Sequence, residues 1–388
     1  MFKKRPAQYY IFLLWILLAA FCWIYPYFIN RGNNYKIFIG VYYHLIRSSD
    51  LYIAYPNEYF DTNHYGPLFS LIIAPFAILP YFIGGLLWNI FNAVILLFAI
   101  YKLPIDVNRK NTITLLSTLS FAQSQYEMQS NALTASLIIL SFVFTLERKE
   151  AIATLLIIAG ALIKLYPIVG LSFFLFSPNK RRFGIWVLIW GSILTFLPAL
   201  LSSLDFVFSS YKAWFQALYE KNQLNILSSS QNYSIMGLFN QIFRSHIANT
   251  PFLIFGAIIA GLNLLAFRKS SLDNVINNMN SMEYKLYVLS SILLMVVLFS
   301  TGSESQTYII AILGCFIWLV IQEKPFQGFN LYLTIFILFI SILPTDLFPK
   351  NIRDLLLTDW VIMTWPCIII WLKISWEINV KWLDFSEK

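Results

Sequence analysis

Long apolar runs separated by short polar segments extend along almost the whole of this sequence. The first run covers residues 9–29, and further runs recur up to residue 373. A membrane-spanning helix needs roughly 20 predominantly apolar residues. Only 12% of the residues are charged, whereas a soluble domain carries roughly 25%. The sequence therefore predicts an all-α, polytopic membrane protein.

The positions of lysine and arginine predict the orientation of these runs. The net charge is +8, and the lysines and arginines sit in short clusters between apolar runs, for example at 3–5, 147–150 and 180–182. Such clusters mark cytoplasmic loops, so nucleic acid is not an expected partner. Placing them inside predicts about twelve transmembrane helices in the cytoplasmic (inner) membrane, with both termini cytoplasmic. Residues 1–388 are interpreted as one integral-membrane domain, with a second outer segment at 205–249.

The segment 30–81 is predicted to be a large first outer loop that carries short surface helices. It contains Asp50 and Asp61, two of the three histidines and many tyrosines. Residues 68–79 are apolar but short; they contain Pro75 and are bounded by Pro67 and Pro80. If they crossed the membrane, the basic residues of 102–110 would lie outside, contrary to the charge rule. We therefore predict a half helix at 68–79, either re-entrant or lying on the surface.

Charged groups next to hydrocarbon are costly, so each is a functional candidate. Lys164 ends an apolar helix and is followed by Tyr-Pro. It could bind a lipid-linked phosphate as a point charge, or it could simply snorkel at a helix end. His64 could contact the same phosphate or share a proton with Asp61, or it could be an ordinary hydrogen-bonded loop histidine.

Two carboxylates are candidates for a general base, and one predicted turn is a candidate for sugar binding. Asp50 and Asp61 could remove the proton from an acceptor hydroxyl, although solvation or helix capping would equally explain a loop carboxylate. Glu127, Gln129 and Asn131 lie in an outer turn. Their side chains could bind sugar hydroxyls or could only satisfy the turn.

Motifs for nucleotides and metals are not found. The sequence contains no Walker motif, no GxGxxG, no HExxH and no Cys/His set with metal-ligand spacing, and its three cysteines lie within apolar runs, as small buried residues do. Nucleotide-driven transport and cytosolic nucleotide-sugar chemistry therefore lose support. We expect neither a metal nor a cofactor.

Four short stretches share the order of motifs known from one enzyme family. They are Asn34-Tyr35-Lys36-Ile37-Phe38 with Asp50-Leu51-Tyr52; His64-Tyr65-Gly66-Pro67-Leu68-Phe69 with Ala74-Pro75, Leu79-Pro80 and Trp88-Asn89; Gln129-Ser130-Asn131; and Lys164-Leu165-Tyr166-Pro167. Over residues 10–205 the chain resembles the glycosyltransferase family 87 membrane proteins, a branch of the GT-C superfamily. The remainder agrees with that family only in hydropathy.

The resemblance implies a polyprenyl-phosphate-sugar donor, often of mannose, and a glycan or glycolipid acceptor. Transfer would take place outside the cytoplasmic membrane, among membrane lipids, with inversion and without a nucleotide. It also implies a catalytic carboxylate early in the first outer loop, where this chain has Asn34. Since an amide cannot act as a general base, either Asp50 or Asp61 takes that role or the mechanism is not retained. The alternatives are a lipid or polysaccharide transporter and a non-catalytic family member.

Overall fold

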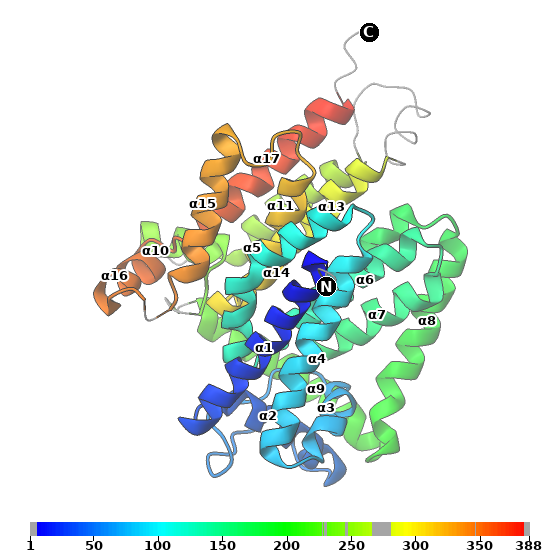
Figure 1. Ribbon diagram of the computed structural model, residues 1–388. Coiled ribbons are helices and arrows are strands. Elements are labelled where there is room, and N and C mark those ends of the chain that lie inside the picture. The colour runs from blue at the N-terminus through cyan, green and yellow to red at the C-terminus, as the bar shows by residue number, and fades with distance from the viewer. Residues whose placement is uncertain are drawn as a thin grey trace, which may run out of the picture. The chain divides into compact units, whose positions relative to one another are not determined.

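Helices are the regular elements of this protein throughout the part of the chain that the structure describes (Figure 1). The structure is a computed structural model, and it describes residues 6–226, 228, 231–244, 247–265, 281–345 and 347–383. The helices are α1 (Ala7–Phe28), α2 (Asn33–Ile46), α3 (Phe69–Ala77), α4 (Tyr81–Lys102), α5 (Val107–Tyr126), α6 (Asn131–Leu146), α7 (Glu150–Ile163), η1 (Tyr166–Phe176), α8 (Lys180–Phe196), η2 (Leu197–Leu200), α9 (Leu204–Ile226), α10 (Ile235–Phe243), α11 (Asn249–Leu265), α13 (Met282–Leu298), η3 (Ser305–Tyr308), α14 (Ile309–Val320), α15 (Gly328–Ile342), α16 (Lys350–Asp354), η4 (Leu355–Asp359) and α17 (Thr364–Leu383). The predicted all-α class is confirmed for these residues.

The chain divides into two compact units. The first unit comprises Met1–Leu103 and Ser124–Lys221, and the second comprises Pro104–Gln123 and Asn222–Lys388. Helices α5 and α9 each contribute to both units. The segment 30–81 and all the candidate site residues belong to the first unit.

Three helices of the described residues are long and apolar enough to cross a membrane: α1, α4 and the continuous segment Lys180–Leu200. The bent pair Lys350–Asp359 and Thr364–Val380 would add a fourth. Other predicted spans correspond to shorter helices, such as the 16-residue α6 and the 14-residue α7. At 1.5 Å per residue these are about 24 and 21 Å long, less than the hydrocarbon thickness of about 30 Å. Membrane character is supported, but the predicted count of twelve spans is not confirmed.

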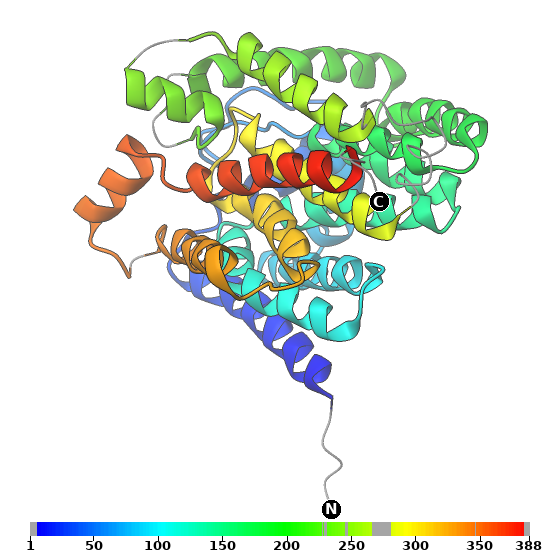
Figure 2. The ribbon, with the colours of Figure 1, turned by 90° about the horizontal axis from the view of Figure 1, so that it is seen from above.

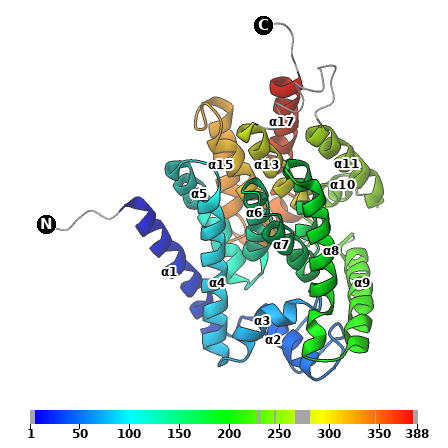
Figure 3. The same cartoon turned by 90° about the vertical axis from the view of Figure 1, so that its right-hand side faces the viewer.

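The predicted half helix at 68–79 folds as the nine-residue helix α3, which is about 14 Å long and too short to span a bilayer. It packs between α2 and α4, as Figure 3 shows. The last carbonyls of a helix have no partner within it. Here the hydroxyls of Tyr35 and Tyr43 donate to the carbonyls of Phe76 and Ala77, at 3.1 and 3.2 Å. Side chains of α2 therefore complete the end of α3.

Aromatic side chains form the core that joins α2, α3 and α4 in the first unit. The ring of Phe38 lies 5.0 Å from that of Tyr65, 4.9 Å from that of Phe69 and 5.8 Å from that of Trp88, measured between centroids. All four side chains are buried. Because edge-to-face aromatic pairs contribute about 0.5–1.5 kcal/mol beyond their buried area, this cluster holds the end of the loop 47–68, at Tyr65, on the helices.

The second unit is organised by α13, α14 and α17, and Figure 2 shows α17, in red, crossing the other two. The buried carboxylate of Glu377 accepts hydrogen bonds from the hydroxyl of Tyr287, at 2.8 Å, and from the indole of Trp318, at 2.9 Å. Lys373 pairs with the other carboxylate oxygen at 2.9 Å. A buried charge is tolerated only when it is paired and hydrogen-bonded, and this carboxylate meets both conditions. Its contacts connect α17 with α13 and α14.

Candidate active site

The middle of the loop 47–68, which connects α2 to α3, is attached to the start of α2. The side-chain amide of Asn33 donates to the carbonyl of Phe60 at 2.6 Å and accepts from the backbone N–H of the same residue at 2.7 Å. Asp61 follows immediately, in the left-handed backbone region with a φ of 70°. This paired contact fixes the position from which the Asp61 carboxylate leaves the loop.

Asp50 shapes the first part of the loop. Its carboxylate accepts from the backbone N–H of Tyr52 at 2.7 Å, and its carbonyl accepts from the hydroxyl of Tyr55 at 2.7 Å. This is the local turn chemistry that Asp side chains favour. The hydroxyl of Tyr52 donates in turn to the carbonyl of Tyr65 at 3.1 Å. Asp50 therefore helps to position the later part of the loop.

A single glycine lets the loop touch the end of α7. The N–H of Gly66 donates to the carbonyl of Ile163 at 2.9 Å. A Cβ added at Gly66 would lie 2.0 Å from the carbonyl oxygen of Leu162 and 3.0 Å from the ring of Trp214. Glycine is therefore required for this close approach. The contact brings Tyr65 next to Lys164, the residue that follows α7.

Lys164 lies in a polar and aromatic setting at this junction. Its ammonium donates to the side-chain oxygen of Asn131 at 2.9 Å. It also lies over the rings of Tyr65 and Tyr166, 5.6 and 5.0 Å from their centroids, within the range of cation–π attraction. The side chain is only partly buried. A fixed cation that retains exposed surface can bind an anionic ligand.

The turn between α5 and α6 supplies the other polar groups near Lys164. Ser130 donates to the hydroxyl of Tyr65 at 3.0 Å, and that hydroxyl donates to the side-chain oxygen of Gln129 at 3.4 Å. Ser130 and Asn131 are fully buried, whereas Gln129 is partly exposed. Tyr65 thus connects the loop with a turn whose amides can donate to and accept from sugar hydroxyls.

Helix α4 holds this turn in place. The indole of Trp88 donates to the carbonyl of Met128 at 3.5 Å, where the chain reverses with a φ of 55°. The side-chain oxygen of Asn92 accepts from the backbone N–H of Leu133 at 3.2 Å. The first N–H groups of a helix lack partners within it, so Asn92 satisfies one of them in α6. The turn is rigidly mounted on a long helix.

Asn34 has a partner that explains its amide. Its side-chain N–H donates to the backbone carbonyl of Glu127 at 2.7 Å. An ionised carboxylate is acceptor-only and could not make this contact. Glu127 retains an exposed surface, but the surrounding protein limits hydration of its carboxyl group and raises its pKa, while the positive charge of Arg31 opposes the rise. Asn34 therefore links α2 to the α5–α6 turn.

His64 is neutral at physiological pH. Burial is the main reason why its pKa falls from 6.5 to about 4, and the charge of Lys221 adds to the effect. Lys164 acts in the same direction, whereas Asp61 opposes it. The ammonium of Lys221 lies 3.9 Å from the Asp61 carboxylate. The indole of Trp214 donates to the backbone carbonyl of His64 at 2.9 Å and so fixes the residue between these charges.

Several residues of this site carried no signal in the sequence. Trp214 belongs to the segment 205–249, whose aromatic residues are typical of a surface helix, yet its side chain is 1% exposed. Lys221 lies 160 positions after its partner Asp61, and Tyr65 stood out only as part of a motif. All three are identified by their proximity in the fold and not by a local sequence pattern.

The predicted site residues fall into two groups. The first group interacts with Lys164 or with a residue next to it. Asn131 accepts a hydrogen bond from Lys164, and Gln129 accepts one from its neighbour Tyr65. His64 interacts electrostatically with both Lys164 and Asp61. The described contacts of Asn34, Glu127 and Asp50 lie elsewhere in the loop and the turn. Among the described residues, no group of three or more His, Cys, Asp or Glu side chains could hold a metal ion.

Comparison with known families matches residues 63–341 to the model of glycosyltransferase family 87. The match covers more than two thirds of the chain. It extends far beyond residue 205, where the resemblance was expected to end, and it begins after Asn34, Asp50 and Asp61. A search among curated proteins found no match. Because the family model covers most of the sequence, the chain belongs to glycosyltransferase family 87.

Proposed function

We propose that this protein transfers a sugar, such as mannose, from a polyprenyl-phosphate carrier to a hydroxyl group of a glycan or lipid acceptor. The reaction takes place at the outer face of the cytoplasmic membrane, and both termini lie in the cytoplasm. Family membership supports a glycosyltransferase, and the apolar helices support a membrane protein.

The arrangement around Lys164 is the observation that carries this proposal. Its ammonium is held by Asn131 at 2.9 Å and flanked by the rings of Tyr65 and Tyr166. A sugar phosphate presents an anion beside a ring of hydroxyl groups. A cation next to buried amide and hydroxyl groups, with aromatic faces on both sides, matches that combination of chemistries.

The transfer is a single displacement at the anomeric carbon. The acceptor oxygen forms a bond to that carbon while the bond from the carbon to the phosphate oxygen breaks, which inverts the configuration. Negative charge accumulates on the departing polyprenyl phosphate, and the Lys164 ammonium stabilises it. Gln129 and Asn131 orient the sugar hydroxyls. The proton of the acceptor hydroxyl passes to a carboxylate.

Asp61 is the better supported candidate for that carboxylate. Its side chain is exposed, and its carboxylate lies 3.9 Å from the ammonium of Lys221. Both carboxylates accept a hydrogen bond from the backbone of their own turns. Among the described contacts, Asp61 is the one of the two that also interacts with Lys221 and His64. Neutral His64 lies near both Lys164 and Asp61, so it can donate a hydrogen bond to the phosphate without repelling the ammonium.

Replacement of Lys164 tests the proposal directly. In Lys164→Gln, polyprenyl-phosphate binding should weaken about 10- to 100-fold, because a charge-assisted hydrogen bond contributes about 1.5–3 kcal/mol. Transfer from a radiolabelled polyprenyl-phosphate mannose should fall with it. Lys212→Gln removes an exposed lysine of α9 in the same unit. It should leave polyprenyl-phosphate binding and sugar transfer unchanged. Full activity in Lys164→Gln, or no transfer by the wild type with any of several sugars, would reject the proposal.

A non-catalytic role is the second candidate, and the contact of Asn34 favours it. The amide fills a structural position where the family pattern has a carboxylate. If the protein is not an enzyme, polyprenyl phosphate should still bind through Lys164, but no sugar should be transferred by the wild type. Loss of transfer in Asp61→Asn, with binding retained, would instead establish catalysis through the proposed base.

A further inference from the structure

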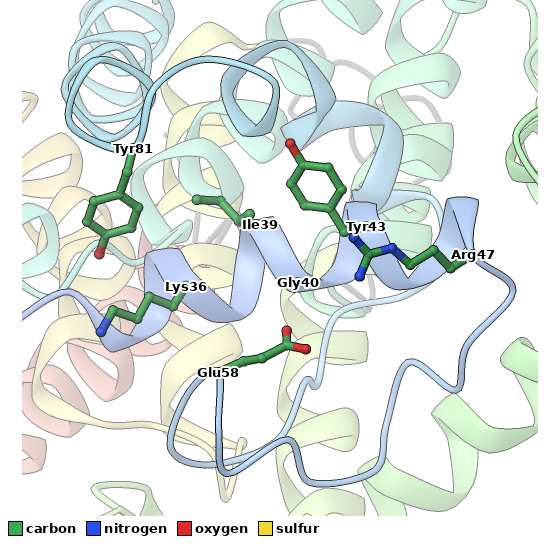
Figure 4. A pocket seen from close by; sticks show the side chains of 7 residues that line it. All are labelled: Lys36, Ile39, Gly40, Tyr43, Arg47, Glu58 and Tyr81. Carbon is green, nitrogen blue, oxygen red and sulfur yellow. The ribbon is translucent and has the colours of Figure 1, made fainter.

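A cavity of about 400 Å³ lies beside α2, on a part of the first unit away from Lys164. Figure 4 shows Lys36 and Tyr81 at one end of this cavity, Tyr43 and Arg47 at the other, and Gly40 between them. These residues are spaced at i, i+4, i+7 and i+11, with Lys36, Gly40 and Tyr43 in α2 and Arg47 directly after it, and therefore share one face of the helix. A Cβ at Gly40 would lie 2.7 Å from the ring of Tyr59, so the glycine allows that ring to pack against this face.

The charges around the cavity are predominantly positive. Lys36 and Arg47 are exposed, and within the described residues neither has a carboxylate within 4 Å. Glu58 also lines the cavity. Its carboxylate lies 3.2 Å from the imidazole of the buried His44. The lining thus carries two cations and one carboxylate, which leaves it with a net positive charge.

A second cavity of about 420 Å³ adjoins the first, since both are lined by Lys36 and Tyr81. Its other lining residues include Arg31 and the aromatic side chains of Tyr27 and Phe28. Phe28, at the end of the membrane-spanning helix α1, is 73% exposed. Basic groups therefore stand directly next to apolar surface at the end of a helix that can cross the bilayer.

We propose that these joined cavities bind the phosphate group of an anionic amphiphile. The phosphate lies next to Lys36 and is also held by either Arg31 or Arg47. The apolar chains of the amphiphile lie along the exposed end of α1. The same phosphate chemistry could also hold a free inorganic phosphate, and the experiment below separates the two sources. Tyr35 and Phe38 lie on the side of α2 that packs into the core next to Tyr65. The cavity lies on the opposite side of the helix. The proposal therefore does not depend on sugar transfer.

Lipid binding by the purified, delipidated protein tests this assignment without any measurement of activity. Native mass spectrometry would follow adducts with phosphatidylglycerol, with zwitterionic phosphatidylcholine and with inorganic phosphate. The double variant Lys36→Gln/Arg47→Gln should bind phosphatidylglycerol about 25-fold more weakly, because each cation near an anionic lipid contributes about fivefold. Phosphatidylcholine binding should not change.

Two further variants make the result decisive. Arg181→Gln/Lys212→Gln removes one arginine and one lysine that are exposed elsewhere in the same unit and should bind as the wild type does. Lys36→Arg/Arg47→Lys keeps both charges and should retain binding, which separates lost charge from misfolding. Phosphate binding that depends on Lys36 and Arg47, with no difference for phosphatidylglycerol, would assign the site to free phosphate. Equal binding of both ligands by all variants would overturn the proposal.

Discussion

Gly66→Ala tests whether the loop must touch the end of α7 for the site to form. The new Cβ would lie 2.0 Å from the carbonyl oxygen of Leu162, so one of the two segments must move by about 1 Å or more to restore an ordinary contact. The ring of Trp214, 3.0 Å from the same point, blocks movement in another direction. Overpacking of this kind costs about 1–3 kcal/mol of unfolding free energy.

Two measurements on the purified protein follow from this displacement. The melting temperature should fall by about 2–12 °C, since 1 kcal/mol corresponds to about 2–4 °C in a unit of this size. The rate of sugar transfer should fall about 100-fold, because a misplacement of about 1 Å in a catalytic site has an effect of that order. Tyr65 and His64, which precede the substituted residue, would both shift relative to Lys164.

Gly184→Ala is the matched control, because it makes the same chemical change in α8 where no atom lies within 4 Å of the new Cβ. Its melting temperature should stay the same or rise, since alanine favours a helix over glycine by about 1 kcal/mol. The reasoning is refuted if Gly66→Ala melts and transfers sugar as the wild type does. A drop in both variants would point to a general intolerance of the protein to alanine.

Two other substitutions test separate parts of the site. Asn34→Asp should lower the unfolding free energy by about 1–3 kcal/mol, because a carboxylate would face the Glu127 carbonyl; a gain in transfer activity would show that the position serves as a base. The pKa of His64 falls from 6.5 to about 4 on folding, so the unfolded chain binds an extra proton between these values and the wild type loses stability as pH falls through this range. The loss amounts to at most about 3 kcal/mol, less where solvent reaches the ring. The melting temperature of His64→Gln should depend less on pH than that of the wild type. Identical melting curves for the two proteins from pH 7 to 4.5 would contradict this.

The positions of the helices follow closely from the sequence. The span predicted at 131–146 coincides with α6, and the run at 9–29 with α1. Proline and the charge rule also predicted a half helix at 68–79, and the structure has the nine-residue helix α3 within this range. These predictions succeed because apolar runs, prolines and polar breaks act locally, over a few turns of one helix.

The lengths and packing of the helices could not be predicted as well. Hydropathy counts apolar residues without distinguishing contact with lipid from contact with protein. In α14, every side chain from Ile309 to Val320 is buried within the protein, so its hydropathy says little about the bilayer. For this reason the sequence indicates twelve spans, whereas few of the described helices are long enough to cross on their own.

The sequence by itself determined the residue types of the site: the lysine before Tyr-Pro, the amides of the α5–α6 turn and the polar loop. The tertiary structure decided how they meet. Lys164 contacts Asn131, 33 positions earlier, and Gly66 contacts Ile163, 97 positions later. Such pairs form only when segments far apart in the sequence pack together, and at Gly66 the packing requires the absence of a Cβ. A local sequence pattern does not specify which distant segments come into contact.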